Sequence, residues 1–118
     1  MSTVRTIARL VELELLPAGD HTRLEEITRR YALAITADVA ALIDPNDPDD
    51  PIAKQFVPDV REAITTPDEA PDPIGDARHE VVPGVIHRYH DRVLLKLTHA
   101  CPVYCRFCFR REMVGPGG

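Results

Sequence analysis

The chain has 118 residues, of which 44% are hydrophobic and 28% are charged, and its formal net charge is −5 at pH 7. This length leaves room for one small domain, and the negative charge argues against a nucleic-acid binder or a binder of anionic membranes. No stretch approaches the roughly 20 apolar residues of a membrane helix. Three cysteines, an odd number, without a signal-peptide pattern argue against a disulfide framework. We therefore expect a reducing, cytoplasmic compartment.

Charge and proline content divide the chain into three regions. Residues 1–43 carry five Arg against six Asp or Glu, residues 44–80 carry three Lys or Arg against eleven, and residues 81–118 carry six against two. We expect an N-terminal helical region (1–43), an acidic Pro-rich connector (44–80), and a segment (81–118) that begins a barrel. Since only the last segment is basic, it is the part suited to anionic ligands.

The first region is predicted to form three helices. Apolar residues at helical spacing run from Val4 to Leu15 and are expected to end near Pro17. A second helix is expected to start near Thr22 with a capping box, and a third, short helix follows Thr36 and runs to about residue 43. The apolar stripes of the first two helices are read as core packing: Val4, Ile7, Ala8, Val11, Leu15, Leu24, Ile27 and Tyr31.

The connector is rich in proline and aspartate. Seven of the eleven prolines lie between residues 44 and 76, and proline disfavours long regular elements because it fixes φ and lacks an N–H donor. Asp50 as N-cap and Pro51 as first helical residue predict one short helix through Phe56. The remaining aspartates are interpreted as turns and helix caps rather than as a metal site.

The third region begins with a strand pattern. Residues Val85–Tyr89 and Arg92–Thr98 flank a tight turn and predict a hairpin. The apolar run Val93–Leu95 is typical of a strand buried on both faces of a parallel barrel, and barrel enzymes place catalytic residues in the loops that follow such strands. The expected fold is therefore an α+β fragment: N-terminal helices, a connector, a hairpin, and the first strand of an incomplete (β/α) barrel.

All three cysteines follow that strand, as Cys101, Cys105 and Cys108 in the spacing C-x3-C-x2-C. Thiolates this close can hold one metal site, and an iron–sulfur cluster usually takes four cysteines. Three cysteines would leave one iron open to a ligand that is not protein. An alternative is a structural zinc module with His99 or His87 as the fourth ligand, because Cys3His is a known zinc set.

The cysteine spacing, with aromatic Phe107 before the last cysteine, resembles the signature of radical S-adenosylmethionine enzymes. The flanking residues His87–Leu95 and Cys105–Arg111 are similar to the lysine 2,3-aminomutase family, radical enzymes that also use pyridoxal phosphate. The match runs from about Val82 to Gly118, and family members are several times longer. The resemblance implies an isomerase that moves the amino group of L-lysine from C2 to C3.

The resemblance also implies cofactors and partners. The three cysteines would hold a 4Fe-4S cluster whose open iron binds S-adenosyl-L-methionine, and an electron donor such as flavodoxin or ferredoxin would reduce it. The substrate would be a small amino acid, and the full-length protein could form a homo-oligomer. The implied positions are Phe107 beside the nucleoside, Arg88, Tyr89 and Arg92 on pyridoxal 5'-phosphate, and Arg110 on the substrate carboxylate.

The chain departs from the family pattern in what it lacks. In the family, the lysine that forms the Schiff base and the acidic residues that hold the substrate amines lie downstream of residue 118, and only Lys54 and Lys96 are present here. We therefore expect an N-terminal fragment that is inactive alone. Glutamate or a protein-bound lysine remain alternative substrates, and a stand-alone binding protein remains an alternative function.

Overall fold

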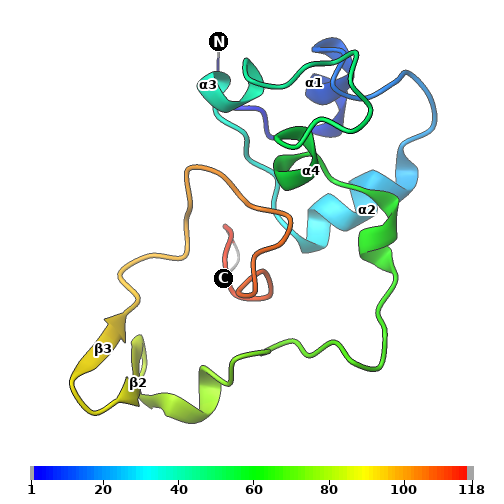
Figure 1. Ribbon diagram of the computed structural model, residues 1–118. Coiled ribbons are helices and arrows are strands. Elements are labelled where there is room, and N and C mark those ends of the chain that lie inside the picture. Colours follow the sequence, from blue (N-terminus) through cyan, green and yellow to red (C-terminus); the bar gives the residue numbers. More distant parts are fainter. Residues whose placement is uncertain (1, 117–118) are drawn as a thin grey trace.

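The computed structural model describes residues 2–116, and its elements lie in two groups at opposite ends of the molecule (Figure 1). Its radius of gyration is 16.1 Å, larger than the roughly 13 Å of a compact domain of about 100 residues, so the molecule is elongated. The helical group contains α1 (Ile7–Glu12), α2 (Thr22–Arg30), α3 (Ala37–Ala40), α4 (Ala53–Phe56) and the 3-10 turn η1 (Val60–Ala63). The other group contains the 3-10 turn η2 (Ala77–His79) and the strands β1 (Glu80–Val82), β2 (Val85–Tyr89) and β3 (Arg92–Leu95).

The helical body, residues 2–63, contains most of the hydrophobic core. Val4 and Ile35 form an isolated antiparallel bridge, with N–O distances of 2.8 and 3.0 Å, which fastens the start of the chain to the segment after α2. The predicted core positions of α2, namely Leu24, Ile27 and Tyr31, are buried. The full buried cluster is Val4, Ile7, Leu10, Leu24, Ile27, Tyr31, Leu33, Ile35 and Ala40.

Helix α1 is shorter than the apolar spacing predicts. Val4 lies in the bridge rather than in the helix, and the helix ends at Glu12, well before Pro17. The end is a Schellman arrangement, because Leu15 N–H donates to Leu10 O (2.9 Å) and Glu14 N–H donates to Val11 O (3.0 Å). Glu14 has φ 59°, a left-handed conformation that usually favours glycine. A backbone motif, and not proline, therefore ends this helix.

The predicted helix starts are partly confirmed. Helix α2 begins at Thr22 as expected, but Thr22 is not its cap, since its N–H and hydroxyl both donate to Asp20 Oδ1 at 3.0 and 2.6 Å. Thr36 does cap α3 through Val39 N–H. Asp50 accepts from the backbone of Ile52 (2.8 Å) and Ala53 (2.6 Å) and so caps the turn that leads into α4. The helix itself starts at Ala53 rather than at Pro51.

The strands form one antiparallel sheet in the order β1-β2-β3. This confirms the hairpin, and it adds β1, which the sequence pattern did not predict. The expectation that the second hairpin strand is buried on both faces is wrong for residues 2–116. All four residues of β3 are exposed, and Leu97 beyond it is 85% exposed. The helices and the antiparallel sheet confirm the α+β class. Within residues 2–116 no layer covers β3, so the parallel barrel strand is not confirmed.

An extended segment links the two groups, and the chain then returns to the helical body (Figure 1). We call residues 100–111 the cysteine loop. Tyr104 of this loop is buried and its N–H donates to Ala34 O at 3.1 Å. The loop thus packs against the segment that follows α2. Among the described helices, none has the length and apolar content needed to span a membrane.

Candidate functional site

The cysteine loop is fastened to the helical body through Arg106, which lies between the second and third cysteines. Its Nε and Nη2 donate to the two carboxylate oxygens of Glu62 at 3.0 and 2.7 Å, and its Nη1 donates to Ala32 O at 2.9 Å. The side chains of Arg106 and Glu62 are only 7% and 12% exposed. The backbone N–H of Arg106 also donates to Gln55 O at 2.8 Å. Sequence reasoning did not single out Arg106 or Glu62, because no local pattern links residues 44 positions apart.

The three cysteines have free thiols and lie in different surroundings. Cys101 is exposed, whereas Cys105 and Cys108 are partly buried and belong to one turn, in which Cys108 N–H donates to Cys105 O at 3.1 Å. Residues 2–116 contain no group of three His, Cys, Asp or Glu side chains arranged to hold a metal ion. The two candidate zinc ligands, His87 and His99, are therefore not gathered with the thiols. The cysteines fit a cluster in kind and spacing, but their three thiols are not gathered around one point.

Arg110, the implied carboxylate ligand, is paired within the chain. Its Nε donates to Asp76 Oδ2 at 2.8 Å, and its guanidinium lies 4.6 Å from the centroid of the Phe109 ring. Asp76 is only 3% exposed and is held in a turn where its N–H donates to Asp72 Oδ1 at 2.9 Å. The terminal nitrogens of Arg110 make no hydrogen bond with the described residues. Such a guanidinium has a fixed edge and a free end that can bind a carboxylate.

The implied phosphate ligands lie on the hairpin and have different partners. Arg88 Nη1 donates to Ile74 O at 2.6 Å, in the same connector turn that holds Asp76. Arg92 lies 4.4 Å from the centroid of the Tyr89 ring, and its Nη1 is 3.3 Å from Asp91 Oδ2. Arg88, Tyr89 and Arg92 are all exposed. The connector turn thus contacts Arg88 and Arg110, whereas Arg92 stands apart from it.

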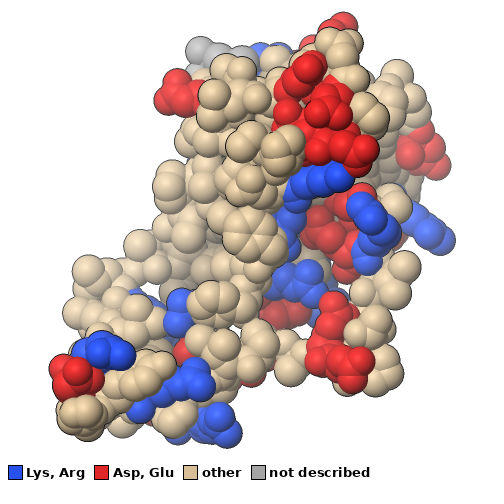
Figure 2. Space-filling view, viewed as in Figure 1, with Lys and Arg blue, Asp and Glu red and all other residues tan. Residues whose placement is uncertain are grey.

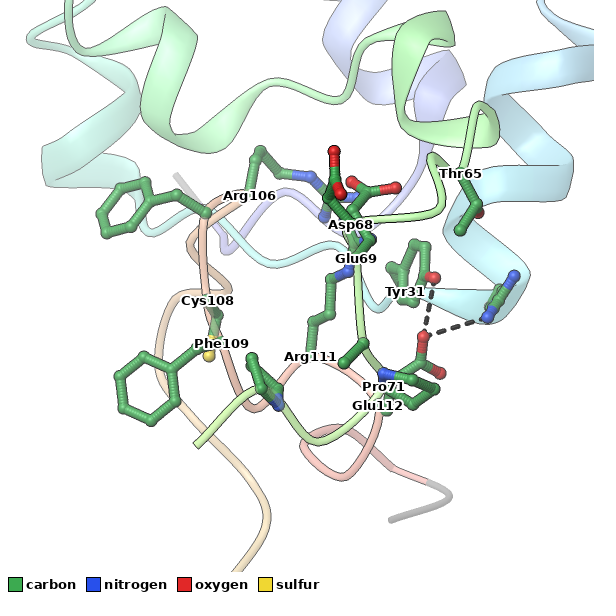
Figure 3. Close-up of a pocket in the computed structure, with 14 residues that line it drawn as sticks. Tyr31, Thr65, Asp68, Glu69, Pro71, Arg106, Cys108, Phe109, Arg111 and Glu112 are labelled. Carbon is green, nitrogen blue, oxygen red and sulfur yellow. Dashed lines mark hydrogen bonds and ion pairs between the residues drawn. The ribbon is translucent and has the colours of Figure 1, made fainter. Parts of the chain in front are cut away.

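A pocket of about 370 Å³ lies between the cysteine loop, α2 and the connector (Figure 3). Cys108 and Arg111 lie along its loop side, and Asp68, Glu69 and Pro71 come from the connector. Phe107, the implied nucleoside neighbour, also lines it and is 68% exposed. The pocket therefore brings a thiol, an aromatic ring and cationic groups to one side of the loop.

Tyr31 and Glu112 line one side of this pocket and are hydrogen-bonded to each other. Tyr31 Oη and Arg30 Nη2 both donate to Glu112 Oε1, at 2.8 and 3.0 Å, as the dashed lines in Figure 3 show. The guanidinium of Arg111 lies 4.4 Å from the centroid of the Tyr31 ring. Burial, followed by the hydrogen bond to Glu112, raises the pKa of Tyr31. The C-terminal end of the cysteine loop is therefore also attached to α2.

Charge is distributed unevenly over the surface, as Figure 2 shows. Acidic side chains gather over the helical end, where the connector begins, and basic side chains are prominent around the hairpin. This agrees with the acidic balance of residues 44–80 and the basic balance of residues 81–118. An anionic ligand is therefore attracted more strongly toward the hairpin end.

The chain is similar to proteins named L-lysine 2,3-aminomutase from several bacteria. The chain is 37% identical over 95% of its length to L-lysine 2,3-aminomutase of Clostridium subterminale, and 43% identical over 95% to the protein of that name from Acetoanaerobium sticklandii. The resemblance to the lysine 2,3-aminomutase family is thus confirmed. A 37% identical match to the Bacillus subtilis L-lysine 2,3-aminomutase covers 98% of the chain, and so includes the cysteine loop. No family model matches the chain.

The similarity extends over only part of each relative. The chain spans 27% of the Clostridium protein and 25% of the Bacillus protein, about a quarter of the length of the aminomutases it matches. The activity, substrate and partners of those whole proteins are therefore carried to this chain only as proposals.

Proposed function

We propose that this chain is part of a radical S-adenosylmethionine aminomutase that moves the amino group of L-lysine from C2 to C3. The observation that carries the proposal is the similarity to proteins named L-lysine 2,3-aminomutase along nearly the whole chain. The C-x3-C-x2-C spacing of its only three cysteines supports the radical chemistry. In this proposal the protein is an isomerase, its substrate is a small amino acid, and an electron donor such as flavodoxin or ferredoxin serves it.

The cysteines are assigned a 4Fe-4S cluster, which would supply the electron that splits S-adenosyl-L-methionine. Thiolate is the ligand that iron–sulfur clusters prefer, and all three thiols belong to one loop. Phe107 is exposed beside Cys108 in the same pocket, which suits the nucleoside contact proposed for it. Since the thiols are not gathered in this structure, the loop would have to rearrange when a cluster forms.

The arginines are assigned the anionic groups. Arg110 would hold the substrate carboxylate with its free terminal nitrogens, while Asp76 orients the guanidinium from the Nε side. Arg88, Tyr89 and Arg92 would contact pyridoxal 5'-phosphate from the hairpin. Arg88 and Arg92 have different partners here, so their shared contact with one phosphate requires Arg92 to leave Asp91. The exposed pair with Asp91 is weak enough to permit this.

The division into a helical region (1–43), a connector (44–80) and the start of a barrel (81–118) also remains a proposal. The exposed apolar side chains of β3 support the barrel, because an apolar strand face is stable only when another layer covers it. Further strands would supply that layer. We further propose that these 118 residues alone do not turn over lysine, because they span about a quarter of their relatives.

The test is anaerobic reconstitution of the chain with iron and sulfide, followed by metal and sulfide analysis and by electron paramagnetic resonance of the reduced sample. We expect about four irons per chain and a spectrum that changes when S-adenosyl-L-methionine is added. The triple substitution of Cys101, Cys105 and Cys108 by Ser should abolish iron binding, and His87→Gln is the control that should not. Zinc bound without sulfide, with loss on His99→Gln, would instead establish a zinc module. Conversion of lysine by the chain alone would contradict its proposed inactivity.

A further inference from the structure

The cysteine loop has a fixed half, which the helical body holds from Tyr104 onward, and an exposed half, which contains Cys101. In the fixed half, the N–H groups of Tyr104 and Arg106 donate to Ala34 O (3.1 Å), in the segment after α2, and to Gln55 O (2.8 Å), in α4. The helical body therefore holds the backbone on either side of Cys105. In the exposed half, the N–H of Cys101 makes a long contact of 3.4 Å with Tyr104 Oη, and the chain before the loop is held at His99, whose carbonyl accepts from Gly115 N–H at 2.9 Å. Within residues 2–116 the loop itself is therefore attached directly to the helical body from Tyr104 onward.

The strongest attachment of the fixed half is the pair of Arg106 and Glu62. Both carboxylate oxygens accept from the guanidinium, and the third nitrogen, Nη1, donates to Ala32 O. Charge-assisted, bidentate hydrogen bonds of this kind are the strong ones, and they are stronger when water is excluded. All three nitrogens of this guanidinium, and three of its five N–H donors, are engaged inside the protein, so Arg106 is less suited to an anionic ligand than Arg110.

Glu62 is itself fixed before it meets the loop. It is the fourth residue of a capping box, in which its Oε1 accepts from Asp59 N–H (3.0 Å) while the Asp59 carboxylate holds the start of η1. The same oxygen accepts from Arg106 Nε. The Glu62 carboxylate is therefore held by η1 as well as by Arg106. The Arg106–Glu62 pair thus attaches the loop to a fixed point of the helical body.

The Arg106–Glu62 pair positions Cys105 and Cys108 but not Cys101. Cys105 directly precedes Arg106, and the Cys108 N–H closes the turn onto Cys105 O at 3.1 Å. Both cysteines border the same small crevice as Ala32 and Glu62. Cys101 is exposed and lies outside it.

We propose that Glu62 is a positioning residue, which acts through Arg106 to hold Cys105 and Cys108 as a fixed two-thiol half-site that Cys101 joins. The first part concerns the loop alone. The second part, the joining of Cys101 when a cluster forms, rests on the proposed function. In this arrangement Cys105 and Cys108 are held by the helical body, whereas Cys101 is exposed.

The first arm of the test is the alkylation rate of each thiol by iodoacetamide in the 118-residue chain, resolved by mass spectrometry. In the unmodified sequence we expect Cys101 to react faster than Cys105 and Cys108. Glu62→Gln should raise the rates of Cys105 and Cys108 about tenfold, because local opening becomes more frequent, and should leave Cys101 unchanged. Unchanged rates at Cys105 and Cys108 in a folded Glu62→Gln chain would overturn the proposal.

Glu80→Gln is the matched control. Like Glu62, Glu80 accepts from a backbone N–H (Gly84, 2.9 Å) and pairs with a cation (Lys96, 3.3 Å), but it does so in the hairpin. It should leave all three thiol rates unchanged. Circular dichroism identifies a variant that has unfolded, in which all three thiols would react alike. If Glu62→Gln unfolds, Arg106→Lys replaces it as the test variant, since lysine keeps the charge but loses the bidentate geometry. Its alkylation rates should rise at Cys105 and Cys108 and stay unchanged at Cys101.

The second arm is cluster reconstitution with iron and sulfide. Glu62→Gln should reduce the iron bound per chain and broaden the resonance spectrum of the reduced sample, and Glu62→Asp should restore part of both. If the unmodified chain binds no cluster, the proposed function fails, while the alkylation rates still decide the role of Glu62. If the unmodified chain binds a cluster and Glu62→Gln binds it equally well with the same spectrum, the positioning role fails and the proposed function stands.

Discussion

The helical body and the hairpin are both made from apolar sequence, yet only one of them forms a core. In the helical body Val4, Leu10 and Ile35 are completely buried, because α1, α2 and the bridge face one another within residues 2–63. In the hairpin only Ile86 is buried, and the residues of β3 are exposed. The difference shows that an apolar pattern alone does not ensure burial: within residues 2–116 no layer covers β3.

The largest expected loss of stability comes from a substitution in the core of the helical body, and the same substitution beside the hairpin should have little effect. Leu10→Ala should lower the free energy of unfolding by about 2–5 kcal/mol, because it leaves a cavity where the side chain is fully enclosed. The same change at Leu97, which is 85% exposed, should cost less than about 0.5 kcal/mol. Urea unfolding followed by circular dichroism measures both. A loss at Leu97→Ala as large as that at Leu10→Ala would show that the hairpin side chain is packed in solution.

An intermediate effect is expected where the connector joins the two regions. Asp76→Asn should cost about 1–2 kcal/mol, between the values for exposed and buried pairs, because Asp76 is buried while Arg110 is partly exposed. Asp91→Asn, which removes an exposed pair with Arg92, is the matched control and should cost less than about 0.5 kcal/mol. Denaturant midpoints measure the comparison. Equal midpoints for the two variants would mean that the turn at Asp76 does not link the regions.

A pH-dependent effect is expected from Tyr31, which belongs to the helical body. Its pKa is raised in the folded chain, first by burial and then by its hydrogen bond to Glu112. The stabilisation is therefore complete below the unfolded pKa of about 10 and is lost as the pH rises through the higher folded value. Urea unfolding between about pH 9 and pH 11 should show a steeper loss for the unmodified chain than for Tyr31→Phe. Parallel losses would show that Tyr31 ionises equally in both states.

Sequence reasoning predicted the parts of the chain whose causes are local. The apolar face of α2, the cap at Thr36 and the hairpin around residues 90–91 each depend on residues a few positions apart, and each is confirmed. Asp50 holds the turn before α4 as its sequence position suggests, but the helix starts at Ala53 with Ile52 as N-cap. The capping box at Thr22 was wrong because Asp20, two residues earlier, offers a competing acceptor. A local sequence pattern does not tell which of two nearby side chains caps a helix, because either can accept from the same backbone N–H groups.

The contacts around the candidate site could not be predicted in the same way. Glu62 and Asp76 reach arginines 44 and 34 positions away, and no periodicity records that pairing. The sequence correctly placed the cysteines in one loop, but their unequal burial depends on where that loop meets the helical body. The assignments to cluster, cofactor and substrate remain predictions.

The smallest expected effect strengthens the helical body without touching the hairpin. Glu14 has φ 59° at the end of α1, and its side chain is exposed. A left-handed conformation costs a non-glycine residue about 1–2 kcal/mol, and glycine loses more chain entropy on folding, so Glu14→Gly should stabilise the chain by about 0.5–1 kcal/mol. Glu12→Gly, at the last residue of the helix, is the control. It should destabilise by about 1 kcal/mol, to which loss of the exposed pair with Arg9 adds little. Opposite shifts of the denaturant midpoint would confirm that the backbone motif ends α1, and a loss in both variants would show that Glu14 is not left-handed in solution.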